Sequence, residues 1–251
     1  MWGRDWDLPT LIAHCADSEV LAVELCATHA HGVEASLNEK QRLAVRNAFE
    51  ESPVHCVGIG SSESFDAPDH MKLKQSVAAA QDFIRLSHDV GGSGVKVKSG
   101  TFHNGVTKEQ TVEQVGKTLR DLAIYGDGFG QEIRLEVEGE MADFQFVKSI
   151  MDVADHPAAR LCWNCNQQDL HGDGLVANFN LVKGYFGRTS YVREFDAGKY
   201  PHGKLLEQFV RMDYRGWLLL KGLSTPSNPV ESLAEQRRLF FQLIAQGQGR
   251  I

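Results

Sequence analysis

The chain lacks the features that mark membrane proteins and nucleic-acid-binding proteins. No stretch of its 251 residues approaches the run of about 18 apolar residues that a membrane-spanning helix needs. Basic residues are in the minority, with 26 Lys and Arg against 33 Asp and Glu and a net charge of −7. Binding along a phosphate backbone requires clustered Lys and Arg. Neither a membrane nor a nucleic acid is therefore an expected partner.

Cysteine is scarce, and its pattern argues against a disulfide framework or a zinc site. The five cysteines are an odd number and lie scattered within apolar segments. Cys162 and Cys165 have the CxxC spacing, but they end a predicted strand, whereas a redox pair begins a helix. No second Cys or His pair follows at zinc spacing. Because the first residues are too polar for a signal peptide, we expect buried free thiols in a reducing cytoplasm.

The sequence also lacks internal repeats, low-complexity tracts and any linker long enough to separate domains. Its composition is that of an ordinary globular protein, 42% hydrophobic and 24% charged, which suffices for a sizeable core. Chains of this length commonly form one undivided α/β barrel. Residues 1–251 are therefore expected to form a single domain.

Strand and helix signals alternate along the whole chain, which is typical of a parallel sheet covered by helices. The predicted strands are Val20–Cys26, Val54–Ile59, Val95–Lys98, Ile133–Val137, Ala159–Trp163, Ser190–Phe195 and Trp217–Leu220. Among the predicted helices, Asp7 is expected to cap the first, Asn38 the second and Thr107 the fourth. Another helix is expected over Leu175–Phe186. This order predicts a (β/α)₈ TIM barrel.

The predicted barrel is one strand short, because the pattern supplies seven strands. The first strand should precede the helix that begins near Leu8, and only Met1 to Asp5 remain to form it. Strands average about five residues, so the first strand is expected to be truncated or missing. A start site assigned too far downstream or a trimmed chain would explain this, and so would a functional loss of the strand.

Four predicted strands end in polar residues, namely Glu136, Asn164, Arg193 and Lys221. The carboxyl ends of barrel strands converge on one face, where catalytic groups lie in barrel enzymes. The sequence therefore predicts one cavity surrounded by these residues.

Several phrases resemble the sugar isomerase/epimerase superfamily, the xylose isomerase-like TIM barrels. They are Val23-Glu24-Leu25, Gly94-Val95-Lys96-Val97, Leu135-Glu136, Trp163-Asn164 and Tyr214-Arg215-Gly216-Trp217. The resemblance covers most of the chain and implies a metal-assisted enzyme that moves a proton through an enediol intermediate. Its members hold Glu, Asp, His and Glu around one divalent metal at the four strand ends.

This chain departs from that ligand set at three of the four positions. Glu136 matches the first carboxylate, while Asn164 replaces the Asp and keeps one oxygen ligand. Arg193 replaces the imidazole and cannot bind a metal, because a guanidinium has no lone pair to offer. Lys221 replaces the second Glu. A weak or lost metal site at Glu136 and Asn164 is expected, without a tightly bound cofactor; any ion would be one divalent Mn, Mg, Zn or Co.

The two cations suggest a substitute for the metal. Lys221 and Arg193 are expected to pair with Glu136 and Glu138, which would leave a site for an anionic sugar; a purely structural cluster of ion pairs is the alternative. Other candidate substrate-binding residues are His29 and His31 after the first complete strand and Lys98 at the end of the third. Arg134 should point into the barrel, with Glu24 as its expected partner.

Two hypotheses about function remain open. In the first, the chain is an isomerase or epimerase of sugars or sugar phosphates in carbohydrate metabolism, with Glu136 and Lys221 as catalytic residues. In the second, it is a non-catalytic or repurposed barrel that binds a carbohydrate or a small anion. The expected partner in both is a small carbohydrate or sugar acid, and a homo-oligomer is left open.

Overall fold

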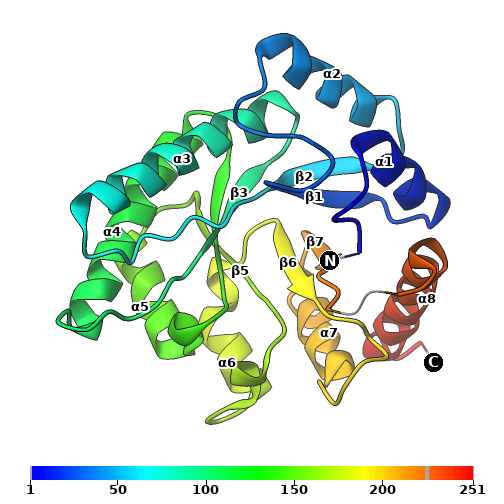
Figure 1. Cartoon of the computed structure of the whole chain (residues 1–251). Coiled ribbons are helices and arrows are strands. Elements are labelled where there is room, and N and C mark those ends of the chain that lie inside the picture. The colour runs from blue at the N-terminus through cyan, green and yellow to red at the C-terminus, as the bar shows by residue number, and fades with distance from the viewer. Residues whose placement is uncertain (1, 224–225, 251) are drawn as a thin grey trace.

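The computed structural model, which describes residues 2–223 and 226–250, is a parallel β/α barrel (Figure 1). The strands are β1 (Ala22–Cys26), β2 (His55–Gly60), β3 (Gly94–Lys98), β4 (Glu132–Glu136), β5 (Ala159–Cys162), β6 (Thr189–Val192) and β7 (Trp217–Leu220). The helices are α1 (Leu8–Asp17), α2 (Glu39–Glu50), α3 (His70–Asp89), α4 (Lys108–Asp127), α5 (Phe144–Ala154), α6 (Leu175–Val182), α7 (His202–Arg211) and α8 (Pro229–Gly247). The predicted TIM-barrel fold is confirmed.

The barrel wall is hydrogen-bonded in two sections. Strands β1 to β5 form one parallel sheet in sequence order, and β6 pairs with β7 in a second. Two isolated parallel bridges, Leu161 with Phe186 and Asn164 with Tyr191, connect the β5 and β6 segments. Among the residues that the structure describes, no ladder joins β7 to β1, so this seam remains open to further pairing.

Local sequence signals explain where most helices begin. Asp7 caps α1, and Asn38 and Thr107 form capping boxes at the starts of α2 and α4, as predicted. The helix predicted over Leu175–Phe186 is shorter, because α6 ends at Val182 and a 3₁₀ turn, η3 (Lys183–Tyr185), follows. Glycine at position 184 is a poor helix former, which accounts for this early end.

The sixth strand is also shorter than predicted. It ends at Val192, whose carbonyl accepts a hydrogen bond from the Lys221 amide at 2.8 Å. Strand β7 itself ends at Leu220, so the residues after Val192 have no further strand beside them. Arg193 therefore lies just beyond the strand, in the loop over the mouth of the barrel.

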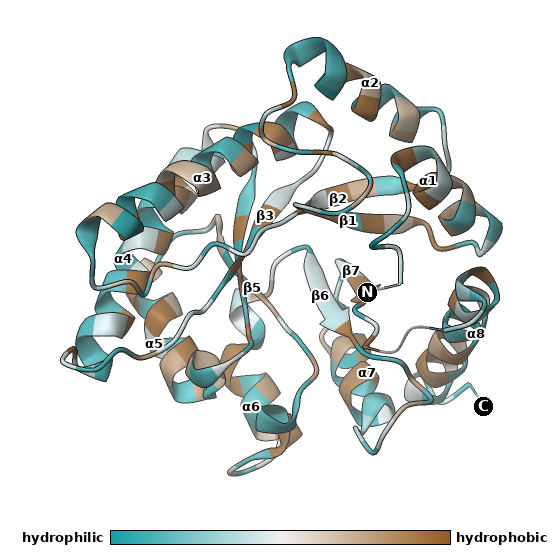
Figure 2. Ribbon diagram, in the orientation of Figure 1, coloured by the Kyte–Doolittle hydropathy of each residue, from teal (hydrophilic) through white to brown (hydrophobic). Residues whose placement is uncertain are grey.

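The helices pack apolar faces on the outside of the strands, and hydrophilic and hydrophobic residues alternate along them (Figure 2). The inside of the barrel is more polar. Arg134 is completely buried there, and it pairs with Glu132 at 2.8 Å, not with Glu24 as predicted. Gly94 leaves room for this guanidinium, because an added Cβ would lie 2.9 Å from its Cζ.

No described helix has the length and apolarity to span a bilayer.

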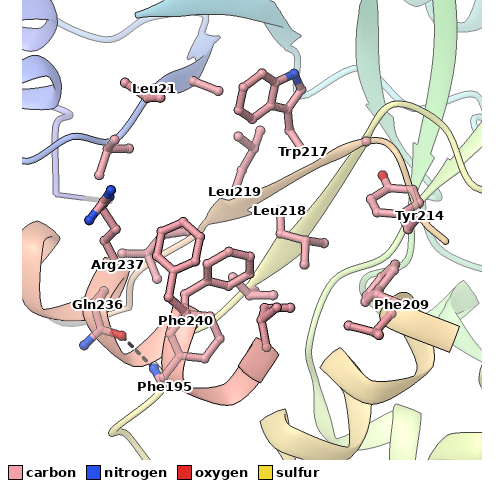
Figure 3. Close-up of a pocket in the computed structure, with 18 of the residues that line it drawn as sticks. Leu21, Phe195, Phe209, Tyr214, Trp217, Leu218, Leu219, Gln236, Arg237 and Phe240 are labelled. Atoms are coloured by element: carbon pink, nitrogen blue, oxygen red, sulfur yellow. Dashed lines mark hydrogen bonds between the residues drawn. The ribbon is translucent and has the colours of Figure 1, made fainter. Parts of the chain in front are cut away.

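An apolar cavity of about 440 Å³ lies beside the open seam (Figure 3). All residues of β7 line it, together with side chains of α8 such as Phe240. Successive side chains of a strand point to opposite faces, so a cavity that touches all of them touches the edge of the strand.

Residues 2–5 form a turn, and seven strands lie in the described ranges. A truncated first strand remains a prediction.

Candidate functional site

The side chain of Glu136, at the carboxyl end of β4, is the centre of an ion-pair network. It is completely buried. Lys221 Nζ contacts its Oε1, and Lys96 Nζ lies 3.0 Å from its Oε2. Asn164 Nδ2 donates to Oε1 at 2.9 Å. Three strands thus direct polar groups onto one carboxylate.

Lys221 follows β7 and joins this centre to the loop residue Glu138. Its Nζ lies 3.0 Å from Glu138 Oε2 and 5.4 Å from the ring centroid of Tyr191. The contact expected between Lys221 and the two carboxylates is therefore present. Arg193 Nη1 donates to the Lys221 carbonyl at 3.0 Å, while its Nη2 is 3.9 Å from Glu138 Oε1.

The charges in this network reinforce one another. Burial alone would raise the pKa of Glu136, but Lys96 and Lys221 outweigh it, and the pKa is lowered. Burial likewise opposes the charge of Lys96, but the attraction of Glu136 and Glu24 prevails and raises its pKa. Glu136 and Lys96 are therefore both ionised at neutral pH. Exposed ion pairs contribute little to stability, whereas breaking a buried pair leaves an uncompensated charge.

The network does not offer a divalent ion a ligand set. In the described parts of the chain, no three His, Cys, Asp or Glu side chains are grouped as metal ligands. Both oxygens of Glu136 face ammonium groups, and the Asn164 amide nitrogen points at the same carboxylate. Ammonium and guanidinium groups have no lone pair for a metal. The residues present do not fit the ion that the resemblance implies.

A cavity of about 160 Å³ opens beside this network, between the ends of β1, β3 and β7. Its charged and polar lining is mainly basic, and two tryptophans add aromatic surface. The lining includes Trp2, Arg4, Trp6, Glu24, His29, His31, Lys96, Tyr191 and Lys221. The rest of the lining is apolar, so the cavity suits a small ligand that carries an anionic group.

Of the predicted substrate-binding residues His29, His31 and Lys98, the two histidines line the cavity and the lysine does not. His29 and His31 both line the cavity, with ring centroids 5.9 Å apart. His31 is held by the backbone, since Nε2 bonds to the Cys26 carbonyl at 2.9 Å and Nδ1 accepts from the Val33 amide at 3.0 Å. Burial lowers the pKa of His31, which favours the neutral ring. Lys98 is exposed and does not line the cavity, whereas Lys96 does.

Two residues that the sequence did not single out as a pair also meet in this cavity. The Tyr191 hydroxyl donates to Glu24 Oε1. Burial raises the pKa of Glu24, an effect that Lys96 and Tyr191 partly offset. The sequence offered one sign of this pair, which is the charged Glu24 in the mainly apolar strand β1. A charged residue inside a barrel normally has a partner.

Asp169 is a buried carboxylate that does not line this cavity. It is completely buried in the 3₁₀ turn η2 (Gln167–Leu170). Its Oδ2 accepts hydrogen bonds from the Tyr200 hydroxyl and the Asn166 amide. These bonds hold two loops together.

Similarity to solved structures is extensive in three dimensions and slight in sequence. L-ribulose 3-epimerase has a TM-score of 0.83 at 11% identity, over 97% of this chain and 90% of that one. The 3-keto-D-glucoside 4-epimerase YcjR from E. coli has a TM-score of 0.79 at 12% identity, over 94% and 95%. A xylose isomerase-like TIM-barrel protein from Mycobacterium smegmatis, in complex with magnesium, has a TM-score of 0.69 at 11% identity, over 97% and 91%.

The chain has the xylose isomerase-like TIM-barrel fold. At these identities the likeness concerns the fold alone. The sequence matches no family model, and no curated protein is similar to it in sequence. Function must therefore be argued from the side chains of this chain.

Proposed function

We propose that this chain is a sugar isomerase/epimerase-like protein that binds a small anionic carbohydrate in the 160 Å³ cavity and uses lysine charge where related folds use a metal. The observation that carries the proposal is the contact of Lys221 Nζ with Glu136, beside a largely apolar cavity whose charged lining residues are mainly basic. Structures of similar fold include enzymes named for ketose epimerisation, which supports a carbohydrate as the ligand.

The chemistry follows from where positive charge is held. When a proton leaves the carbon next to a carbonyl, negative charge develops on the carbonyl oxygen. Lys96 and Lys221 both line the cavity, and Glu136 fixes the position of each ammonium. Fixed ammonium groups can stabilise the enediolate oxygen without being reoriented during the reaction. In this proposal Lys221 is catalytic, and Glu136 orients it.

A carboxylate or phosphate on the sugar would meet the remaining basic groups. Arg4 and His29 line the same cavity, and Trp2 and Trp6 offer flat apolar faces for the sugar. A neutral sugar would make fewer charge-assisted hydrogen bonds there. The proposed substrates are therefore sugar acids or sugar phosphates.

A barrel that binds the same ligand without turning it over is the second candidate. The saturation of both Glu136 oxygens favours it, because a carboxylate held between two ammonium groups is a weak base. The two candidates differ in turnover and share the same binding site.

Calorimetry tests the binding that both candidates share. In buffer with a chelator, D-fructuronate and D-ribulose 5-phosphate should bind at least tenfold more tightly than neutral D-tagatose. Lys221→Met should remove most of this preference, while Lys74→Met, at an exposed position of α3, should retain it. Equal affinity for charged and neutral sugars would overturn the proposal. So would about one equivalent of Mn, Mg, Zn or Co that is lost in Glu136→Ala.

A further inference from the structure

Glu24 differs from Glu136 in the way its carboxylate is used. Both Glu136 oxygens contact lysine ammonium groups, and this side chain is completely buried. Glu24 lines the cavity. Its Oε1 accepts from the Tyr191 hydroxyl, while its Oε2 has no hydrogen-bond partner within residues 2–223 and 226–250. Glu136 thus has an ammonium group at each oxygen, whereas Oε2 of Glu24 is buried and has neither a hydrogen bond nor an ion pair within the described residues.

The neighbouring strand provides the room for this carboxylate. Gly60 ends β2, next to β1 in the sheet. A Cβ added at Gly60 would lie 2.7 Å from Glu24 Oε1, closer than van der Waals contact allows. An alanine there would displace the carboxylate. The absence of a side chain at position 60 is thus part of the site.

We infer that Glu24 is the acid–base residue of this cavity and that Tyr191 is its positioning residue. This inference rests on the proposed function. The Glu24 carboxylate takes a proton from the carbon next to the substrate carbonyl. The electron pair of that C–H bond forms the carbon–carbon double bond of the enediolate, and the carbonyl π pair becomes the lone pair on oxygen. Protonated Glu24 then returns the proton to the same carbon, and the original carbonyl re-forms. If the proton goes instead to the former carbonyl carbon, the hydroxyl proton of the first carbon moves to the enediolate oxygen, and the new carbonyl forms on the first carbon.

The two lysines complete the arrangement. Lys96 and Lys221 line the cavity together with Glu24, so the base and both cations can contact the same ligand. A useful base must be neither fully neutralised nor permanently protonated at working pH. Burial raises the pKa of Glu24, and Lys96, Tyr191 and Arg134 restrain the rise, while Glu136 adds to it. Glu136 does not satisfy this requirement, because Lys96 and Lys221 keep it ionised and neutralise its charge.

Deuterium exchange from D₂O into D-fructuronate or D-ribulose 5-phosphate, followed by NMR, measures this proton transfer directly. Glu24→Gln should retain binding by calorimetry within about threefold and reduce the exchange rate by at least ~100-fold, the lower end for general-base catalysis. Glu63→Gln, which removes a carboxylate from the loop after β2, should change neither quantity. Glu24→Asp should recover part of the lost exchange.

Tyr191→Phe tests the positioning role through a readout that a merely structural residue would not move. The hydroxyl lowers the pKa of Glu24, so its removal should shift the acidic limb of the exchange profile to higher pH. Gly60→Ala should also reduce exchange, because the added Cβ would displace the carboxylate. This variant also provides a second test if Glu24→Gln does not fold.

The outcomes separate the inference from the proposed function. Failure of every probe to bind overturns both. Binding without exchange in the unmodified chain overturns the acid–base role of Glu24 and leaves the binding proposal standing. Exchange that persists in Glu24→Gln, or in Gly60→Ala where the first variant is unfolded, also overturns the inference. Loss in Glu24→Gln with partial recovery in Glu24→Asp supports it.

Discussion

The mouth of the barrel and the seam between β1 and β7 use the same strands in opposite ways. At the mouth, buried charges from several strands satisfy one another around Glu136. Along the seam, apolar side chains face a 440 Å³ cavity, and no ladder joins the two described strand edges (Figure 3). Leu21 and Trp217 remain 44% and 40% exposed there. The mouth resists change because Glu136 and its two lysines neutralise one another, whereas the seam can accept additional structure.

The largest effect should come from removing the central carboxylate of the mouth. Glu136→Gln leaves Lys96 buried without its nearest counter-charge, and Lys221 with Glu138 alone. Breaking a buried pair from one side typically costs about 3–5 kcal/mol. We expect a loss of this size in the free energy of unfolding, measured by urea denaturation at pH 7.

Glu138→Gln is the matched comparison at the edge of the same network. Its side chain is 38% exposed, so its pairs with Lys221 and Arg193 are partly exposed. Partly exposed pairs contribute up to about 1 kcal/mol. Similar losses in the two variants would show that Glu136 is not the centre of the network.

Sequence patterns predicted the mouth better than the seam, for a physical reason. Strand ends converge in any parallel barrel, so polar residues at 136, 164 and 221 could be grouped without coordinates. Which lysine of β3 faces the cavity depends on where the strand ends, and here Lys96 lines it and Lys98 does not. The Glu24–Tyr191 bond joins strands far apart in sequence, and local patterns do not encode such pairs.

Arg134 illustrates the same limit. Its inward direction followed from strand periodicity, but its partner depended on local geometry. Glu132, two residues away on the same strand, receives its Nε at 2.8 Å. Ser93 accepts from Nη2 at 2.7 Å. The expected partner, Glu24, is engaged by Tyr191 instead.

A second prediction compares Glu136 with Asp169, a carboxylate that is buried among mainly neutral partners. Burial raises the pKa of Asp169 from 3.8 to about 7, with opposing hydrogen bonds from Tyr200 and Asn166. A raised folded-state pKa means that stability is fully present below the unfolded pKa and is lost as pH rises through the folded one. Stability should therefore fall by roughly 2–3 kcal/mol between pH 5 and 8 from this residue.

Asp169→Asn isolates that contribution, because an amide resembles the protonated acid and does not titrate. Urea unfolding of both proteins at pH 5, 6, 7 and 8 should show the stability advantage of the variant growing as the pH rises, by roughly 2–3 kcal/mol between pH 5 and pH 8. His residues titrate equally in the two proteins, so their difference removes that background. A constant difference across the range would mean that Asp169 has an ordinary pKa.

The smallest effect is expected at the seam, where an added strand tests the predicted truncation of the first strand. Trp2 already packs beside Gly222, just after β7, since a Cβ at Gly222 would lie 2.6 Å from its Nε1. The Arg4 carbonyl accepts from the Ala30 amide, just after β1, at 2.9 Å. Five apolar, β-branched residues joined ahead of Met1 would therefore enter between the two strands in a parallel direction. Their burial gain is opposed by about 1–2 kcal/mol of ordering entropy per residue.

The seam must also widen, because Ala22 and Leu219 share a buried cluster across it. The net gain should consequently be only about 1 kcal/mol in the free energy of unfolding. Hydrogen exchange gives the sharper readout. Ladder alternation directs the amides of Leu218 and Leu220 away from β6, so a new strand should slow their exchange at least tenfold. An equally long Gly-Ser extension should leave both measurements unchanged. Equal protection of the two amides by both extensions would contradict the claim that the seam between β1 and β7 accepts an added strand.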